Sequence, residues 1–540
     1  MELAKNQEHT VTIEGYGEGG MGVARIDGRV VFVHGALRGE KCRVLILKTL
    51  KSVAFAKVLE VIEPSSERME SDCPYFPRCG GCTYRHIRYE EELRLKKQRV
   101  QDNLSRIGGS DVAVEEILGA QDTLRYRNKA QYPVSKDGAV GFYRARTHEV
   151  IECEHCLLVK PEAAAAAEAL REYMQSCRVA GYDEKTGRGL VRHLYIRSNA
   201  AGESLVCVLV NGDKLPKEDR LVTLLRDACP KCTGIVLGTN TKKGNVILGD
   251  RYRTLWGSDR LEDTLCGKTF RLSVPSFYQV NRVQAERLYA KAIEFAGLTG
   301  QETVLDLYCG AGTITLALLD HAKKVLGAEI VPEAIDDARE NAARNGVKNA
   351  EFFCGDASDV AKKLARENLR PDVITVDPPR KGLAADVVES IAAMQPERVV
   401  YVSCDSATMA RDVKRLADLG YTAQRACAVD MFPRADHVET VVLLSKGEID
   451  SKKVRVEFSL EDMDMSGFQK DATYEQIKAY VLEHTGLKVS SLYISQIKRK
   501  CGLDVGQNYN LSKKEDAKVP KCPPEKEAAI RDALKYFQMI

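Results

Sequence analysis

Val304-Leu-Asp-Leu-Tyr-Cys-Gly-Ala-Gly-Thr-Ile-Thr-Leu316 is the most informative run of residues in this chain. A short apolar segment ends on Asp306, and Gly310 and Gly312 then open an amphipathic helical pattern. Glycines let a backbone turn sharply and approach a ligand closely, as in dinucleotide-binding folds. The spacing lacks the third glycine of the dinucleotide fingerprint, and such a run also occurs in ordinary α/β cores. The run predicts a strand, a tight turn and the start of a helix.

A second apolar run follows about twenty residues later and ends near Glu329, whose carboxylate can bind both ribose hydroxyls of a nucleoside cofactor. Strand patterns alternate with helical stretches from here on, which predicts a doubly wound α/β sheet. The expected strands lie near 303–308, 324–330, 350–354, 372–377, 397–403, 421–430 and 437–445. The carboxyl ends of the first five should gather Asp306, Glu329, Asp356, Asp377 and Cys404 at one edge.

Three motifs near these strand ends carry candidate chemistry. In Asp377-Pro-Pro-Arg380, the prolines fix a rigid turn that holds Asp377 towards a cofactor. Cys404 stands at a strand-to-helix turn, where a helix N-terminus can lower the pKa of a thiol, although a merely buried cysteine is the alternative. His437 and Glu439 follow Asp430-Met-Phe-Pro-Arg434 and supply acid–base groups to the same neighbourhood.

Cysteines upstream suggest a metal site. Cys73, Cys79 and Cys82 place three thiols within ten residues, and Gly80 and Gly81 between them let the backbone fold around a cluster. Three such thiolates need a fourth ligand, for which Cys153 and Cys156 are candidates. Four thiolates suit an iron–sulfur cluster or zinc, and unrelated buried cysteines are the remaining alternative.

These motifs together closely resemble the RNA uracil-5-methyltransferase family, over roughly residues 9 to 446. The resemblance implies S-adenosyl-L-methionine as cofactor and a [4Fe-4S] cluster whose fourth ligand is Cys156. We interpret this cluster as structural or RNA-positioning, since methyl transfer moves no net electrons. The resemblance also implies cofactor contacts from six side chains: Gln279, Tyr308, Thr313, Glu329, Asp356 and Asp377.

The resemblance assigns catalysis to Cys404 and Glu439. Carbon 5 of uracil is a poor nucleophile, so Cys404 is expected to add to carbon 6 and Glu439 to remove the carbon-5 proton after methylation. Cytosine-5 RNA methyltransferases typically carry a cysteine directly after Pro-Pro, and amino-methyltransferases commonly an aromatic residue, where this chain has Arg380. The family most often has Asn-Pro after Ser403-Cys404, and Asp405-Ser406 here leaves the fine positioning of the thiol open.

The expected architecture is multidomain. Residues 1–66 resemble a TRAM domain, an OB-like β-barrel, and residues 67–275 form a central α+β domain that holds the iron–sulfur cysteines. Residues 276–446 form the α/β Rossmann-like methyltransferase domain. Residues 447–540 add a linker with a strand near 453–458 and a small helical module, whose helices are expected at 474–484, 490–500 and 525–537. This module suits either a helix-turn-helix or a protein-docking bundle.

RNA contacts are expected at two places. The first module carries basic side chains that suit phosphates, or else a solvated charged face: Arg25, Arg29, Arg38, Lys41, Lys48 and Lys51. In 124–132 and 141–146, arginines alternate with aromatic residues, which suits stacking on unpaired bases, or else one wet and one packed face of a strand. A helix is expected over 87–107 between these parts.

Composition sets the remaining expectations. A length of 540 residues favours three to four domains, and 44% hydrophobic with 29% charged residues is typical of a soluble globular protein. A net charge of +3 is too small to indicate nucleic acid by itself. The first residues lack a hydrophobic signal region, and 17 cysteines then favour metal ligation or thiol chemistry in a cytoplasmic protein. We expect a monomer without membrane contact.

The substrate is expected to be an unpaired or loop uridine of RNA, which reaches both catalytic groups at the lowest unstacking cost. The TRAM-like module, the cluster cysteines and the length favour 23S rRNA. The alternatives are a tRNA uracil-5-methyltransferase and an RNA-binding iron–sulfur protein with an inactive methyltransferase core. A small-molecule methyltransferase has no use for the first module.

Overall fold

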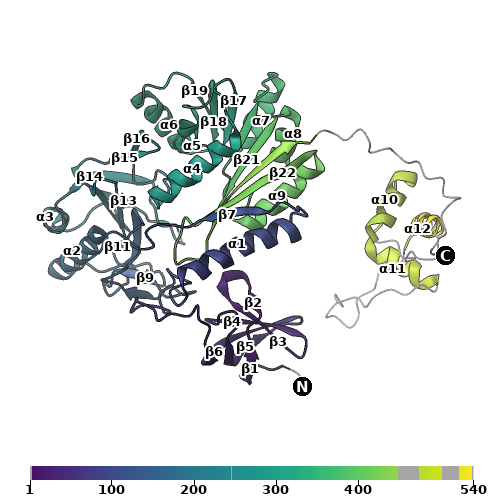
Figure 1. Cartoon of the computed structure of the whole chain (residues 1–540), viewed down its shortest axis with the longest axis horizontal. Helices are drawn as coiled ribbons and strands as arrows, with labels where there is room; N and C mark the ends of the chain where they lie inside the picture. Colours follow the sequence, from purple (N-terminus) through teal and green to yellow (C-terminus); the bar gives the residue numbers. More distant parts are fainter. Residues whose placement is uncertain (1–2, 245, 448–473, 502–521, 538, 540) are drawn as a thin grey trace. The chain divides into compact units, whose positions relative to one another are not determined.

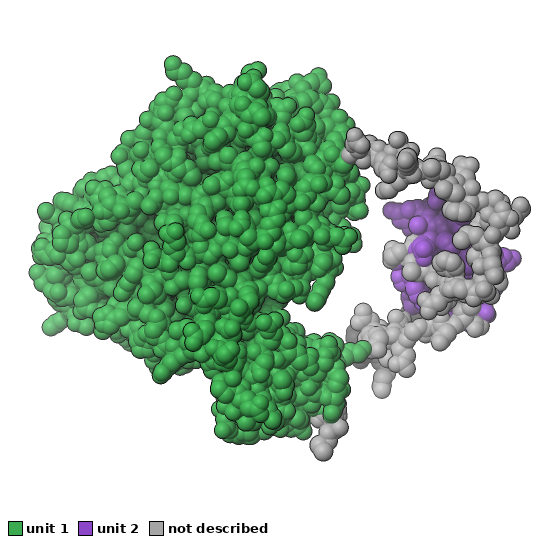
Figure 2. All heavy atoms as spheres, in the orientation of Figure 1, with its two compact units in different colours: residues 1–450 green, residues 451–540 purple. Residues whose placement is uncertain are grey.

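The structure is a computed structural model that describes residues 3–244, 246–447, 474–501, 522–537 and 539. The chain forms two compact units, residues 1–450 and residues 451–540 (Figure 2). The first unit holds three regions, which Figure 1 shows as a small β module, a central sheet with helices and a large helix-covered sheet. None of the described helices combines the length and apolar character needed to cross a membrane.

The N-terminal module is a six-stranded sheet in the order β1-β5-β6-β4-β3-β2, with a single 3₁₀ turn, η1 (Glu18–Gly20). Repeated register shifts between β5 and β6 bend this long pair, as bulges do. The inward positions form a compact apolar core that includes Val31, Val33 and Ile46. Its strands are β1 (Glu8–Thr12), β2 (Gly15–Tyr16), β3 (Gly22–Ile26), β4 (Arg29–His34), β5 (Lys41–Thr49) and β6 (Val53–Glu63).

The central region is built on a five-stranded sheet in the order β14-β13-β12-β11-β8. Two helices, α2 (Pro161–Cys177) and α3 (Glu218–Ala228), pack against it through an alanine- and leucine-rich core. Its strands are β8 (Lys129–Pro133), β11 (Val191–Ser198), β12 (Ser204–Val210), β13 (Cys232–Thr239) and β14 (Arg251–Gly257). Two small hairpins flank it: β9 (Gly141–Tyr143) with β10 (Val150–Glu152), and β15 (Leu261–Leu265) with β16 (Lys268–Leu272).

The third region is an eight-stranded sheet in the order β19-β18-β17-β20-β21-β23-β22-β7. Strands β17 to β21 are parallel, and β23 is antiparallel to both of its neighbours. All seven strands expected from the sequence are present. They are β17 (Thr303–Leu307), β18 (Lys324–Glu329), β19 (Ala350–Cys354), β20 (Val373–Val376), β21 (Arg398–Ser403), β22 (Tyr421–Val429) and β23 (Glu439–Lys446).

Helices cover both faces of this sheet. On one face α4 (Arg282–Ala296), α5 (Thr313–Leu318) and α6 (Pro332–Arg344) pack through Leu288, Leu316 and Ile335. On the other face, α7 (Ala357–Arg366), α8 (Ala385–Met394) and α9 (Ser406–Asp418) pack through residues such as Val360 and Met409. The strands between the two layers are apolar on both sides, as in parallel sheets generally.

Two elements from early in the chain complete this region. Helix α1 (Tyr89–Arg106) packs beside α9, and β7 (Val114–Leu118) pairs in parallel with β22 at the edge of the sheet. The sequence predicted the helix but placed residues 114–118 in the central domain. No local pattern could indicate this pairing, because its partner strand lies at the far end of the same region.

The second unit contains three helices, α10 (Tyr474–Thr485), α11 (Ser491–Lys500) and α12 (Pro524–Tyr536), close to the expected ranges. They share an apolar core that includes Ile477, Ile494 and Ile530. Ser490 caps α11 by accepting a hydrogen bond from the Tyr493 amide at 3.3 Å. The strand expected near 453–458 lies outside the described residues.

Candidate active site

The carboxyl ends of β17, β18, β20 and β21 meet at one edge of the large sheet. Parallel pairing with little stagger places Asp306, Glu329, Asp377 and Cys404 along this edge, as the sequence predicted. Ligands of open α/β sheets bind at such edges.

The loop after β17 turns with three residues in the left-handed region: Tyr308, Gly310 and Gly312, whose φ angles are 71°, 55° and 84°. The amides of Tyr308 and Cys309 both donate to the Ala328 carbonyl, at 2.9 and 3.0 Å. A Cβ atom on Gly312 would lie 3.3 Å from the Cβ of Ala338. Glycine is therefore required at 312, where the loop enters α5 beside α6.

Asp306 holds this loop in place. Its buried carboxylate accepts hydrogen bonds from the Thr315 hydroxyl at 2.5 Å and from the Thr375 hydroxyl at 3.0 Å. Burial raises the pKa of Asp306 to about 6, and the two hydroxyls oppose this. Asp306 joins β17, α5 and β20, so its role is to position the loop.

The carboxylate of Glu329 lies beside the same loop. One oxygen accepts a hydrogen bond from the Gly310 amide at 3.2 Å, and the other accepts one from the Val331 amide at 3.0 Å. The side chain is half-buried at the end of β18. A carboxylate fixed in this way is suited to accept hydrogen bonds from a ribose diol.

The other expected cofactor residues come from several elements. Asp356 is exposed and caps α7 by accepting a hydrogen bond from the Ser358 amide at 2.9 Å. The Thr313 hydroxyl lies 3.0 Å from that of Tyr289 in α4. Gln279 is buried ahead of α4, and its backbone carbonyl accepts a hydrogen bond from Asn128 at 2.9 Å.

Cys404 is half-buried at the turn between β21 and α9. The next residue, Asp405, caps α9 by accepting hydrogen bonds from the amides of Ala407 and Thr408, both at 3.0 Å. Asp and Asn are equally good caps, so the departure from the family's usual Asn at this position keeps the turn intact. The Asn103 side chain in α1 donates to the Ser406 hydroxyl at 2.8 Å and ties α1 to this turn.

The pKa of Cys404 is raised to about 11 by burial and by the carboxylates of Glu439 and Asp377. The sequence suggested a lowered pKa at the helix N-terminus, and this expectation is wrong in direction. Desolvation and two carboxylates outweigh the helix dipole, which is worth at most about 2 kcal/mol. Cys404 is therefore a neutral thiol at pH 7 before any ligand binds.

Glu439 and Asp377 stand next to Cys404. Glu439 is 3% exposed at the start of β23, and burial, with Asp377 nearby, raises its pKa to about 8. Burial and Asp306 raise the pKa of Asp377 to about 7. A carboxyl group with a pKa near the working pH is suited to general acid–base catalysis.

Arg380 and His437 complete the group. An Arg380 guanidinium nitrogen lies 3.0 Å from Nε2 of His437. Burial and Arg380 lower the pKa of His437, so the imidazole is neutral at pH 7. The positive charge of Arg380 also opposes the raised pKa values of both Cys404 and Glu439.

A large cleft of about 1330 Å³ opens in front of Cys404. Its walls come from the N-terminal β module, from α1 and from the turns that carry Arg380, Cys404 and His437. Acidic and basic side chains line it in equal number, six of each, so its net charge does not identify a ligand. The position of the cleft is more informative, because the cleft connects the β module with the Cys404 thiol.

The structure divides the expected RNA-binding residues. Arg38 lines the cleft, whereas Arg25 pairs with Glu14 at 3.5 Å and Lys41 with Glu63 at 3.1 Å. In the segment 124–132, Tyr126 and Tyr132 are buried. The aromatic side chains of that segment therefore pack inside the protein, and the interpretation as a base-stacking surface is wrong there.

Five cysteines line a second cavity, of about 220 Å³. They are Cys73, Cys79, Cys82, Cys153 and Cys156. Gly80 lets the cysteine segment approach the hairpin β9–β10 closely, because a Cβ there would lie 3.1 Å from Cα of Ala145. Within the described residues, no three His, Cys, Asp or Glu side chains are arranged to hold a single metal ion.

Arg85 lies against this cavity with one nitrogen without a partner. Its side chain is 2% exposed and forms an ion pair with Asp72 at 2.7 Å, yet its buried Nε–H has no hydrogen-bond acceptor among the described residues. A buried N–H without an acceptor is costly. Sulfur atoms of a bound cluster would provide acceptors, so the cavity fits a sulfur-rich group larger than one ion.

The sequence contains two regions similar to known families. Residues 88–447 match the family model described as tRNA (uracil-5-)-methyltransferase, and residues 3–59 match the TRAM domain. The second match confirms the expected identity of the N-terminal module.

Relatives of similar length support the first match. An uncharacterized RNA methyltransferase of Clostridium acetobutylicum is 41% identical over 451 residues, 82% of this chain and 98% of that protein. One of Halalkalibacterium halodurans is 43% identical over 445 residues, 82% of this chain and 97% of that protein.

The fold is also similar to a solved structure, the Pyrococcus abyssi tRNA (uracil-54, C5)-methyltransferase in complex with S-adenosyl-L-homocysteine. The TM-score is 0.66 at 26% sequence identity, and the similarity covers 81% of this chain and all of that one.

Proposed function

Since the chain belongs to the RNA uracil-5-methyltransferase family, whose members depend on S-adenosylmethionine, we propose that it methylates carbon 5 of a uridine through a covalent adduct with Cys404. The observation that carries this proposal is the juxtaposition of the Cys404 thiol, which lines the large cleft, with the buried carboxyl group of Glu439 and the half-buried one of Asp377.

Residues at the sheet edge would hold the cofactor. Glu329 receives the ribose, and the loop 308–312 lies against the nucleoside, with Thr313, Asp356 and Gln279 as further contacts. When bound, S-adenosylmethionine supplies an electrophilic methyl group. Asp377 follows the end of β20 at the same sheet edge and lies next to both Cys404 and Glu439.

Cys404 acts as the nucleophile. Its thiolate adds to carbon 6 of the uracil, and the resulting enolate makes carbon 5 nucleophilic enough to accept the methyl group. Arg380 lies where its positive charge favours the thiolate over the thiol. Burial keeps the proton on the Cys404 sulfur in the free protein, so it must pass to a base before the attack. The neighbouring Asp377 carboxylate, with a pKa of about 7, can accept it.

Glu439 acts as the base that ends the reaction. It removes the carbon-5 proton, the carbon 5–carbon 6 double bond forms again, and the thiolate leaves carbon 6. Its raised pKa, about 8, makes it a stronger base than an exposed carboxylate. The neutral imidazole of His437 lies next to the charged Arg380. Both side chains line the cleft through which the uracil enters.

The cleft between the TRAM module and Cys404 supports RNA with a flipped-out base as substrate. We favour 23S rRNA, because the family resemblance of the sequence implies that a TRAM module and a cluster cysteine set are more typical of the rRNA branch than of the tRNA branch. The solved neighbour acts on tRNA, so a tRNA uridine is the second candidate.

Four of the cavity cysteines would hold a [4Fe-4S] cluster: Cys73, Cys79, Cys82 and Cys156. The buried Nε of Arg85, which has no acceptor among the described residues, supports a sulfur-rich group in this cavity. Anaerobic purification, iron and sulfide analysis and the visible spectrum test this assignment. Zinc without iron, or an iron content unchanged by Cys79→Ser, contradicts it.

The test of the activity uses the full chain, S-adenosylmethionine with a labelled methyl group, and unmodified rRNA and tRNA in parallel. We expect label in 5-methyluridine of rRNA and a covalent protein–RNA species in intact-mass spectra. Cys404→Ala should abolish both, whereas Cys207→Ala, which removes a buried thiol from β12 of the central sheet, serves as the control for loss of a cysteine.

Label in 5-methylcytidine or in an N-methylated base contradicts the uracil mechanism. Label confined to tRNA keeps the chemistry and changes the substrate. Methylation by Cys404→Ala at the parental rate contradicts the nucleophile.

A further inference from the structure

The loop between β22 and β23, residues 430–438, leads directly into Glu439 and carries His437. Its successive carbonyl groups are held by residues from elsewhere in the chain. Each carbonyl accepts a hydrogen bond from one side chain. The donors are Gln284 for Asp430 at 3.0 Å, Asn281 for Met431 at 3.1 Å, Lys96 for Phe432 at 3.2 Å, Tyr126 for Pro433 at 3.0 Å, and Arg99 for Asp436. The conformation of this loop is therefore set by residues outside it.

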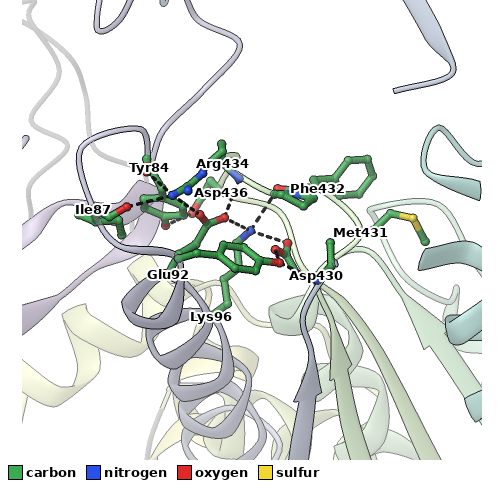
Figure 3. A network of polar contacts seen from close by, with 12 residues as sticks. Tyr84, Ile87, Glu92, Lys96, Asp430, Met431, Phe432, Arg434 and Asp436 are labelled. Carbon is green, nitrogen blue, oxygen red and sulfur yellow. Dashed lines mark hydrogen bonds and ion pairs between the residues drawn. The ribbon is translucent and has the colours of Figure 1, made fainter. Parts of the chain in front are cut away.

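Lys96 is the centre of this arrangement (Figure 3). Its ammonium group donates to Glu92 at 2.8 Å, to Asp430 at 2.7 Å and to the Phe432 carbonyl at 3.2 Å. Glu92 in turn accepts a hydrogen bond from the Arg434 amide at 2.7 Å. The side chains of Glu92, Lys96 and Asp430 are all 0% exposed.

Such a network is an expensive way to stabilise a fold. Each buried ion loses hydration worth several kcal/mol, and replacing a buried pair with apolar residues is often neutral or stabilising. Two positive charges, Lys96 and Arg434, balance two negative ones, Glu92 and Asp430, and the bonds run to specific loop atoms. The hydrogen bonds of the network are directional, and they fix the position of the loop backbone.

The cysteine segment takes part in the same arrangement. The amides of Thr83 and Tyr84, directly after Cys82, both donate to the Arg434 carbonyl, at 2.8 and 3.1 Å. The Tyr84 hydroxyl donates to Asp436 at 2.7 Å. The loop before Glu439 thus lies between α1 and the cysteine segment, and it is bonded to both.

We propose that Lys96 is a positioning residue for the base step, acting through the loop 430–438 on His437 and Glu439. This inference rests on the role proposed for Glu439. Loss of the ammonium group removes the side-chain donor to the Phe432 carbonyl and leaves the Asp430 carboxylate held by the Tyr89 hydroxyl at 2.6 Å, so the loop backbone at 432 shifts and Glu439 no longer meets the carbon-5 proton. The cofactor-binding edge, held by Asp306 and Glu329, stays in place.

The test is Lys96→Met in the full chain, with single-turnover kinetics and intact-mass spectra of the protein–RNA adduct. We expect adduct to form and accumulate while its release slows by about tenfold to hundredfold, the cost of a misplacement of about 1 Å. The KM values for RNA and for S-adenosylmethionine should stay within about twofold, since K_M reports binding when chemistry is slow.

Lys96→Met leaves one excess negative charge, so the variant can fail to fold. The double variant Glu92→Gln with Lys96→Met restores neutrality and should recover thermal stability while the slow release persists. Glu302→Gln is the matched control: it alters a mostly buried carboxylate at the opposite end of β17, where Glu302 binds the Thr299 amide at 2.8 Å. It should lower stability and leave adduct release unchanged.

Parental release rates in both Lys96 variants overturn the proposal. So does a release rate that recovers together with stability in the double variant, because the role of Lys96 is then stability alone. If the parent protein itself forms no adduct and no 5-methyluridine, the proposed function is contradicted instead. The behaviour of the parent therefore distinguishes failure of the proposed function from failure of the role of Lys96.

Discussion

Two loops at the same edge of the large sheet are held in opposite ways. Loop 308–312 is fixed by neighbours within its own fold, through the Ala328 carbonyl and the carboxylates of Asp306 and Glu329. Loop 430–438 is fixed by groups from α1, from the start of α4 and from the cysteine segment, up to 352 residues away along the chain. If the proposed roles hold, cofactor binding depends on contacts within the α/β core, whereas the base step also depends on α1 and the cysteine segment.

The largest effect should come from the end of the remotely held loop. Glu439→Gln removes the base and keeps the shape, so the step that releases product should slow by about 10² to 10⁴-fold. Methylated adduct should accumulate, which denaturing gels or intact-mass spectra measure. Free, unmodified RNA without adduct would contradict the assigned role.

The dependence of turnover on pH should report the ionisation of Glu439 and Cys404. Glu439 and Cys404 have raised pKa values, about 8 and about 11, and both must lose a proton, so turnover should rise by up to about a hundredfold per pH unit between pH 6 and 8. Stability should change in the opposite direction. A carboxyl group whose folded pKa lies above its unfolded value stabilises the fold when protonated, and this contribution is lost as pH rises through about 8.

Thermal unfolding at pH 6 and pH 8.5 checks the sign of this change. The parent should melt lower at pH 8.5, and Glu439→Gln, which carries no titrating proton there, should lose less. An equal loss in both proteins assigns the pH effect to other groups.

A smaller effect is expected at the locally held loop. Glu329→Gln keeps one acceptor and removes the charge that binds a ribose diol, so the KM for S-adenosylmethionine should rise about tenfold, equal to roughly 1.4 kcal/mol. The rate of adduct release at saturating cofactor should stay unchanged. Isothermal titration with S-adenosylhomocysteine measures the binding term without turnover.

The smallest effect concerns the turn that carries the thiol. Asp405→Ala removes the cap of α9 and should cost about 1 kcal/mol of stability, whereas Asp405→Asn should cost almost nothing. Denaturant unfolding of the two variants measures the difference. Equal stability of Ala and Asn variants would show that the cap does not support the turn.

The sequence predicted the parts of this site whose determinants are local. The glycine turn after β17, the acidic end of β18, the Asp-Pro-Pro turn and the cysteine after β21 each follow from a few neighbouring residues and lie where expected. The strand alternation placed them at one edge before any contact was known. The family resemblance added the assignment of Glu439.

What the sequence could not supply depends on residues distant in the chain. The spacing of Glu92 and Lys96 reads as an ordinary helical ion pair, and nothing near it indicates Asp430 as a partner. The same holds for β7, whose partner β22 lies far along the chain, and for the buried aromatic residues of 124–132. The pKa of Cys404 was misjudged because its carboxylate neighbours come from other strands.

The contact between Lys96 and Asp430 also constrains how the protein is made. A ribosome adds about 5 to 20 residues per second, so the 334 residues between them take roughly 15 to 70 s to synthesise. During that interval α1 has left the ribosome with its apolar side chains, Val100 and Leu104 among them, and without the sheet that will cover them. During synthesis, therefore, the apolar face of α1 stays without its final sheet partners until β22 has been made.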